Sequence, residues 1–202
     1  MKKLNILIIA LALSLSSFAQ VEIVPFVGYM FGGSVNFYEG KYKVTDGMDY
    51  GVSLIIPVRD VMDVEINYTR MDSEGKFTPH AGFGGADPTN MSTNYFQIGT
   101  LKAISLNNPK VTPFGSFSLG VTWFDMADYD SRVLFSITAG LGAKIMLTER
   151  IGIMLRGRLM LPMFFGGVGF YAGGGGSGLT LNSYAALIQG DFNAGLVFKL
   201  GN

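Results

Sequence analysis

The chain has 202 residues, is 49% hydrophobic and carries a formal net charge of zero, with 28 glycines and no cysteine. This length suits one domain, the balanced charge excludes a basic surface for nucleic acid, and the lack of cysteine excludes disulfides. No sequence motif indicates a cofactor.

The first nineteen residues have the features of a signal peptide. Lys2 and Lys3 precede an apolar run over residues 4–15, and residues 17–19 form a small-x-small cleavage site. The run is too short for a membrane-spanning helix, which needs about 20 apolar residues. We therefore predict that residues 1–19 are removed on export and that residues 20–202 form a single mature domain. A retained N-terminal anchor is the alternative.

Eight segments of the mature chain alternate between apolar residues and polar or small ones. The clearest covers residues 132–147, where Phe135 and Leu141 belong to the apolar set and Ser136 and Lys144 to the polar or small set. Successive side chains of a strand point to opposite faces, so each segment is a strand with one apolar face. In chain order the segments are residues 22–35, 49–57, 62–71, 94–104, 111–124, 132–147, 151–163 and 187–200.

The polarity of these faces favours a membrane protein. Polar residues that face a lumen and apolar residues that face lipid are typical of transmembrane β-barrels. We therefore predict an all-β fold, an eight-stranded antiparallel up-and-down transmembrane β-barrel. In a soluble barrel the apolar residues would point inward and the charged residues outward. Ten strands is the alternative count if residues 164–184 contain a further hairpin.

The connections between the segments alternate between short and long. With the N-terminus on the periplasmic side, the periplasmic turns are residues 58–61, 105–110 and 148–150. The extracellular loops are then residues 36–47, 72–93, 125–130 and 164–184. Outer-membrane barrels combine short periplasmic turns with longer extracellular loops. We therefore expect the cell outer membrane as the location, with its lipid and lipopolysaccharide as surroundings.

Aromatic residues recur near the predicted extracellular ends of the strands. Such side chains favour the interface between lipid and water, because one part of the ring is apolar and another is wet. We predict an aromatic girdle made of Phe31, Tyr50, Tyr68, Phe96, Trp123 and Phe135.

Short patterns within the strands resemble a known family. They are VPFVGY at 24–29, FQIG at 96–99, PF at 113–114 followed by GV at 120–121, and GLVF at 195–198. Together they resemble the small outer-membrane β-barrel family that includes OmpX and the membrane domain of OmpA. The resemblance implies the fold and insertion by the barrel-assembly machinery, and it specifies activity far less well. Family members often end on an aromatic residue, whereas here Phe198 precedes the sequence KLGN and would take that role.

Six charged residues are predicted to point into the lumen. An eight-stranded barrel is only wide enough for its own side chains, and charges sealed inside it must be paired. Arg156 and Arg158 are two apart on one strand, so both need acidic partners such as Glu65 or Asp191. We predict a salt-bridge network that fills the lumen; a gated conduit is the alternative. The six residues are Glu65, Arg132, Lys144, Arg156, Arg158 and Asp191.

The predicted loops hold few residues that could perform chemistry. His80 is the only histidine and has Ser73 nearby in sequence, but nothing fixes a hydroxyl beside it, so we predict no catalytic and no metal site. The glycine run at 173–178 lacks the Lys-Ser/Thr of a phosphate-binding loop and is predicted to be flexible. We therefore expect a structural or surface-interaction protein that binds an extracellular protein or surface ligand. A narrow porin-like channel is the second reading, and a lipid-modifying barrel enzyme the third.

Overall fold

The computed structural model describes residues 21–36, 40–58, 62–79, 86–104, 110–126, 129–173, 176–185 and 187–200. The predicted signal peptide and His80 lie outside the described residues. In the part of the chain that is described, no helix is long and apolar enough to cross a membrane.

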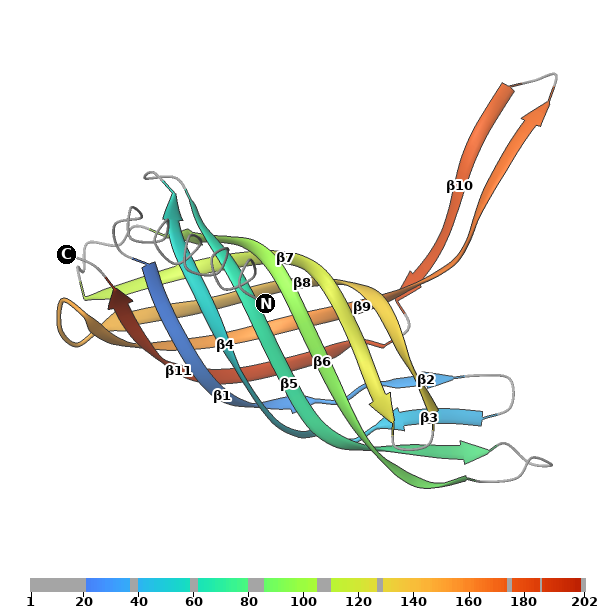
Figure 1. Cartoon of the computed structure of the whole chain (residues 1–202), viewed down its shortest axis with the longest axis horizontal. Coiled ribbons are helices and arrows are strands. Elements are labelled where there is room, and N and C mark those ends of the chain that lie inside the picture. Colours follow the sequence, from blue (N-terminus) through green and yellow to red (C-terminus); the bar gives the residue numbers. More distant parts are fainter. Residues whose placement is uncertain are drawn as a thin grey trace, which may run out of the picture.

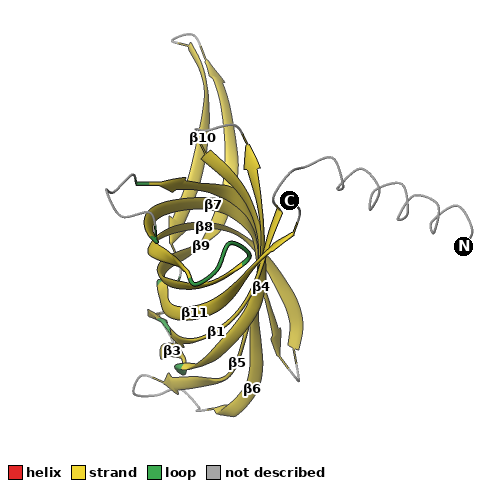
Figure 2. Cartoon of the chain, turned by 90° about the vertical axis from the view of Figure 1, so that its left-hand side faces the viewer, coloured by secondary structure: helices red, strands yellow, loops and turns green. Residues whose placement is uncertain are grey.

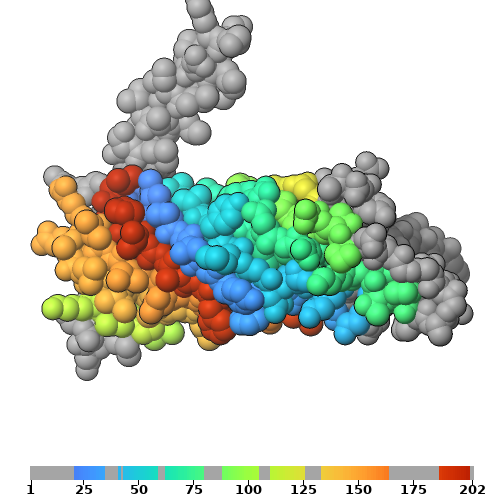
Figure 3. All heavy atoms as spheres, turned by 90° about the horizontal axis from the view of Figure 1, so that it is seen from below, coloured from blue at the N-terminus to red at the C-terminus, as the bar shows by residue number. Residues whose placement is uncertain are grey.

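Eight strands form a closed antiparallel barrel, as predicted. Each strand pairs with the next along the chain, and the last closes on the first, with Ile23 opposite Phe198. Seen from one end, the strands curve around a common axis (Figure 2). The closing seam is visible where the red C-terminal strand lies against the blue N-terminal strand (Figure 3). The eight strands are β1 (Val21–Phe31), β4 (Gly47–Val58), β5 (Met62–Pro79), β6 (Ala86–Ala103), β7 (Val111–Met126), β8 (Tyr129–Met146), β9 (Ile151–Gly173) and β11 (Gln189–Leu200).

Three shorter strands extend the barrel wall without adding to the eight. Strands β2 (Ser34–Asn36) and β3 (Gly40–Val44) form a hairpin, and β3 also pairs with the outer part of β5. Strand β10 (Gly176–Ala185) pairs with the outer part of β9, and the two project from the barrel (Figure 1). The alternative of ten barrel strands is therefore wrong.

The predicted loops at 36–47, 72–93 and 164–184 need a correction. Most of their described residues belong to strands, which extend the barrel strands into long hairpins. Their polar and glycine-rich composition suggested loops. A projecting hairpin, however, satisfies its backbone hydrogen bonds through the facing strand whatever its side chains are. Composition therefore did not exclude strands here.

The two faces of the strands have the predicted polarity. On β8, Leu141 points outward with 72% of its surface exposed, whereas Ser136, Thr138 and Lys144 point inward and are buried. The same holds on β5, where Glu65 is buried and Ile66 is partly exposed. The outside of the barrel is thus an apolar surface that the chain itself does not cover.

The two ends of the barrel differ in their connections. One end, which we call the turn end, holds the short connections between β4 and β5, β6 and β7, and β8 and β9 (Figure 1, left). In the last of these, the Thr148 hydroxyl accepts a hydrogen bond from the Ile151 backbone N–H at 2.9 Å. The opposite end, the hairpin end, carries the long projections.

The interior of the barrel is layered. Along β9 the inward residues run from Met154 through Arg156 and Arg158 to Met160, so a charged layer separates two apolar ones. The layer toward the turn end consists of Val24, Ile55, Leu101, Phe114, Met154 and Val197. The layer toward the hairpin end consists of Met30, Val44, Met71, Met91, Tyr95, Phe124, Leu134, Met160 and Leu187.

Candidate functional site

The charged layer is built around two arginines of β9. Because strand side chains alternate, Arg156 and Arg158 both point inward while Gly157 between them faces outward. Their side chains are only 1% and 3% exposed. The ring of Phe26 lies 5.2 Å from the guanidinium carbon of Arg156 and 5.0 Å from that of Arg158, which adds cation–π attraction to both.

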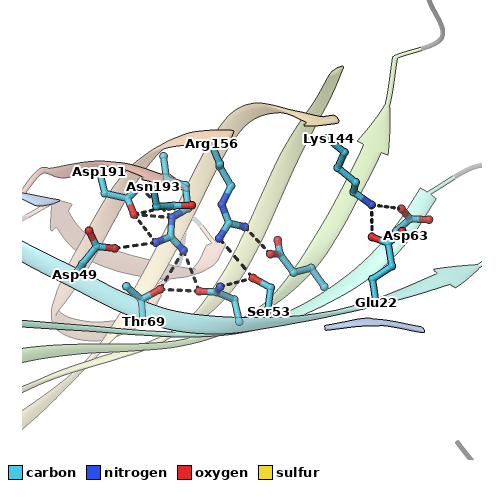
Figure 4. Close-up of polar contacts among 12 residues, drawn as sticks. Glu22, Asp49, Ser53, Asp63, Thr69, Lys144, Arg156, Asp191 and Asn193 are labelled. Atoms are coloured by element: carbon cyan, nitrogen blue, oxygen red, sulfur yellow. Dashed lines mark hydrogen bonds and ion pairs between the residues drawn. The ribbon is translucent and has the colours of Figure 1, made fainter. Parts of the chain in front are cut away.

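Arg156 reaches across the full width of the lumen. Its Nη1 lies 2.5 Å from Oε1 of Glu65, and its Nη2 donates a hydrogen bond to the Ser53 hydroxyl at 3.4 Å. Glu65 is on β5, and three strands separate β5 from β9 on either side of the barrel. This ion pair therefore joins opposite walls (Figure 4).

Arg158 uses all of its donor nitrogens inside the lumen. Its Nε donates to Asp191 at 3.0 Å, and its Nη2 also contacts that carboxylate, which gives a two-pronged pair. Its Nη1 donates to Asn67 and Thr69 on the opposite wall, each at 3.0 Å. The Asn193 amide donates to Asp191 at 2.8 Å (Figure 4). The predicted partners Glu65 and Asp191 are thus the ones that the arginines contact.

Asp49 is a member of this layer that the sequence analysis missed. It is completely buried, and its Oδ2 lies 3.7 Å from Nη2 of Arg158 (Figure 4). Neither of its carboxylate oxygens has a hydrogen-bond donor among the described residues. The sequence could have indicated this, because Asp49 and the inward-facing Ser53 are four residues apart on β4 and therefore lie on the same face of the strand. The layer therefore holds three carboxylates and two guanidinium groups.

The structure places Lys144 elsewhere than in this central cluster. Its Nζ lies 2.6 Å from Glu22 and 3.7 Å from Asp63, and Lys199 lies 3.7 Å from the other oxygen of Glu22. This second cluster lies toward the turn end, and the apolar layer around Met154 lies between it and the arginines. Arg132 lies on β8, where its backbone pairs with that of Phe124 on β7, and its side chain lies outside the described residues.

One further contact crosses the lumen, between Tyr95 on β6 and Gln189 on β11. These strands are also separated by three strands on either side, and both side chains are buried. The Tyr95 hydroxyl donates to the Gln189 carbonyl oxygen. Neither residue was singled out in the sequence, because an isolated tyrosine on an alternating strand gives no sign of a partner on the opposite wall.

Tyr95→Phe is expected to lower the free energy of unfolding by about 1–3 kcal/mol, because the buried Gln189 oxygen loses its donor. Tyr29→Phe is the matched control, since Tyr29 lies on the outer face, and the expected change is within about 0.5 kcal/mol. Urea unfolding of the refolded protein would measure both. Equal effects of the two changes would contradict the cross-lumen contact.

The predicted girdle residues lie on the outer face of the barrel. Tyr50 donates from its hydroxyl to Asp72 at 3.0 Å, and Tyr68 donates to Asn94 at 2.9 Å. Both hydroxyls thus hydrogen-bond to polar side chains of neighbouring strands. Phe31, Tyr50 and Phe96 are exposed, and Tyr68, Trp123 and Phe135 are partly buried.

Metal binding finds no support in the described part of the chain, where no group of three or more potential ligand residues comes together. The described polar layer is thus an arrangement of charged side chains that pair with one another.

Comparison with known proteins identifies the fold. No family model and no curated protein sequence matches the chain. Among solved structures, the outer membrane protein OprG from Pseudomonas aeruginosa matches with a TM-score of 0.63 at 12% identity, covering 91% of this chain and 97% of that one. Neisserial surface protein A matches with a TM-score of 0.59 at 12% identity, covering 89% and 97%. The outer membrane protein AlkL, solved in DMPC lipid bilayers, gives 0.50 at 8% identity, covering 91% and 92%.

These matches define the class of fold. The chain has the architecture of the small eight-stranded outer-membrane β-barrels, and the predicted resemblance to that group is confirmed at the level of fold. At such low identity the likeness carries no activity or ligand from those proteins to this chain.

Proposed function

We propose that this protein is an integral protein of the bacterial outer membrane whose lumen is closed and whose surface hairpins make its contacts. The turn end faces the periplasm and the hairpin end faces outward. Lipid and lipopolysaccharide cover the apolar wall, the barrel-assembly machinery inserts the chain, and the signal peptide directs its export. The proposal includes no catalytic step and no cofactor.

The observation that carries this proposal is the ion pair between Arg156 and Glu65, which joins opposite walls of the barrel. A solute that passed through would have to separate it, together with the Arg158–Asp191 pair beside it. Breaking a buried pair costs about 3–5 kcal/mol. Apolar layers on both sides of the charges add a further barrier to ions.

The hairpins supply the surface for interaction. Strands β2, β3, β5 and β6 continue beyond the barrel as a projecting sheet that carries exposed charges such as Lys41, Lys43 and Glu74. Projecting strands offer backbone groups and side chains to an extracellular protein or surface ligand. This surface, and not the lumen, is where we place the biological contacts.

Two measurements on the wild-type protein test the proposal. In the outer-membrane fraction the band should shift on an SDS gel between unboiled and boiled samples, because a closed barrel resists SDS until heated. In planar bilayers the refolded protein should give no reproducible conductance steps. A soluble band without a shift would contradict the membrane assignment, and regular steps would contradict the closed lumen.

A gated channel is the second candidate, and Asp49 is the observation that favours it. Arg158 has this carboxylate 3.7 Å away in addition to Asp191, so an exchange of partners would move its guanidinium. Asp191→Asn weakens the present pair and would favour the exchange. Conductance steps that appear in this variant, with the heat shift retained, would support the gate. A variant that gives no conductance steps supports the closed lumen.

A further inference from the structure

The outer part of β9 and strand β10 form a hairpin with two open edges. The pairing of β8 with β9 ends at Phe135 opposite Met163, and the pairing of β11 with β9 ends at Gln189 opposite Met160. Beyond these points β9 pairs with β10 alone among the described residues, as Gly169 does with Thr180. We call residues 164–173 of β9 and 176–185 of β10 the projecting hairpin; they are the two orange strands that project from the barrel in Figure 1.

The sequence of this hairpin has none of the usual protection of a strand edge. Between Arg158 and Asp191 there is no Asp, Glu, Lys, Arg or His, and after Pro162 there is no proline. Open edges are normally blocked by charges, by proline or by a covering element, because their unpaired N–H and C=O groups bind other strands. Glycines at 166, 167, 169, 173, 176 and 178 also leave room for another backbone to approach.

The other projecting sheet of the same molecule shows the contrast. Its strands β5 and β6 carry Asp72, Glu74, Lys76 and Pro88, and β3 covers the outer edge of β5, with Lys41 opposite Thr78. The chain thus protects one projection and leaves the other uncharged and open.

We propose that the projecting hairpin pairs edge to edge with the projecting hairpin of a neighbouring copy of this chain in the same membrane. The inference rests on the proposed surface-exposed outer-membrane location and names the partner of one surface element. An uncharged edge has no charge pattern with which to select a charged partner. It also does not repel an identical edge, so a second copy fits it.

The membrane sets the direction of this pairing. All copies insert the same way, so every β9 runs outward and every β10 returns toward the barrel. Antiparallel pairing between neighbours therefore joins β10 of one copy to β9 of the next. Such a head-to-tail contact leaves a free edge on each end copy, so it builds open rows and not only dimers.

Co-purification of two differently tagged full-length copies from one membrane tests the contact. Leu179→Lys with Leu181→Lys places charges on β10 and is expected to lower the recovery of the second copy about tenfold. The matched control, Ser34→Lys with Asn90→Lys, adds two lysines to the other projecting sheet and should leave recovery unchanged. The heat shift of each variant shows that its barrel is folded.

The results separate this inference from the proposed function. Wild-type copies that show the heat shift but purify singly, or a β10 variant that co-purifies like the wild type, would overturn the pairing alone. A wild type without the heat shift would overturn the membrane proposal itself.

Single thiols test the direction of pairing, since the chain has no cysteine of its own. Co-expressed Gly169→Cys and Thr180→Cys copies should form mixed cross-links between β9 and β10 on oxidation. Cross-links between two Thr180→Cys copies alone would overturn the head-to-tail arrangement.

Discussion

Leu141→Arg is expected to lower the free energy of unfolding by about 2–4 kcal/mol, the cost of a cation at the middle of a bilayer. Leu141 lies on β8 midway between Phe135 of the girdle and Leu147 at the turn end, and it points outward with 72% exposure. On a soluble protein such an exposed position would tolerate arginine with a change within about 0.5 kcal/mol. The large expected effect thus comes from lipid. Urea unfolding in lipid vesicles, followed through the single tryptophan Trp123, measures it.

The same substitution at the edge of the bilayer provides the control. Leu147 is 62% exposed and lies in the turn after β8, so Leu147→Arg should cost only about 0–1 kcal/mol. The depth dependence is what distinguishes a lipid-facing wall from any other apolar surface. If the two variants were equally stable, the outer face would not be in contact with the centre of a bilayer.

The sequence predicted the strands and their faces because the information is local. Period-two alternation specifies which side chains share a face of a strand. Because the polar face of a transmembrane β-barrel points to the lumen, the pattern also predicted that Arg156 and Arg158 point inward. The choice of Glu65 as the partner of Arg156 follows a different rule. The strand order of the closed barrel places β5 opposite β9. The stagger between the strands then sets which residues of β5 and β9 lie at the same depth in the lumen. The sequence could therefore propose acidic partners but could not assign them.

The same non-local geometry explains what the sequence analysis missed. Lys144 lies on the lumen-facing side of β8, as its position in the alternation predicted. Its depth along β8, however, places it with Glu22 at the turn end and away from the arginines. Asp49 was taken as the start of a strand, whereas β4 begins at Gly47 and carries it into the charged layer. Depth along the barrel axis depends on register between distant strands, which alternation within one strand does not contain.

Arg158→Ala is expected to lower the free energy of unfolding by about 3–5 kcal/mol, because it leaves buried charge without a partner. The change removes the partner of Asp191, the donor to Asn67 and Thr69, and the cation nearest to Asp49. Lys199→Ala is the control, because its rim contact with Glu22 is long and partly exposed, and the expected cost is at most about 1 kcal/mol. Unfolding in urea, under the conditions used for Leu141→Arg, measures both.

A double replacement separates the value of the pair from the cost of an orphaned charge. Arg158→Met with Asp191→Leu removes both partners and keeps apolar volume, so it should destabilise less than Arg158→Ala. Adding Asp49→Asn should recover further stability. Without Arg158 the buried Asp49 carboxylate has lost its nearby cation, and a neutral amide costs less to bury than an unpaired charge. A cost below about 1 kcal/mol for Arg158→Ala would mean that the arginine is not held by its lumen partners. The closed lumen would then have to depend on the apolar layers alone.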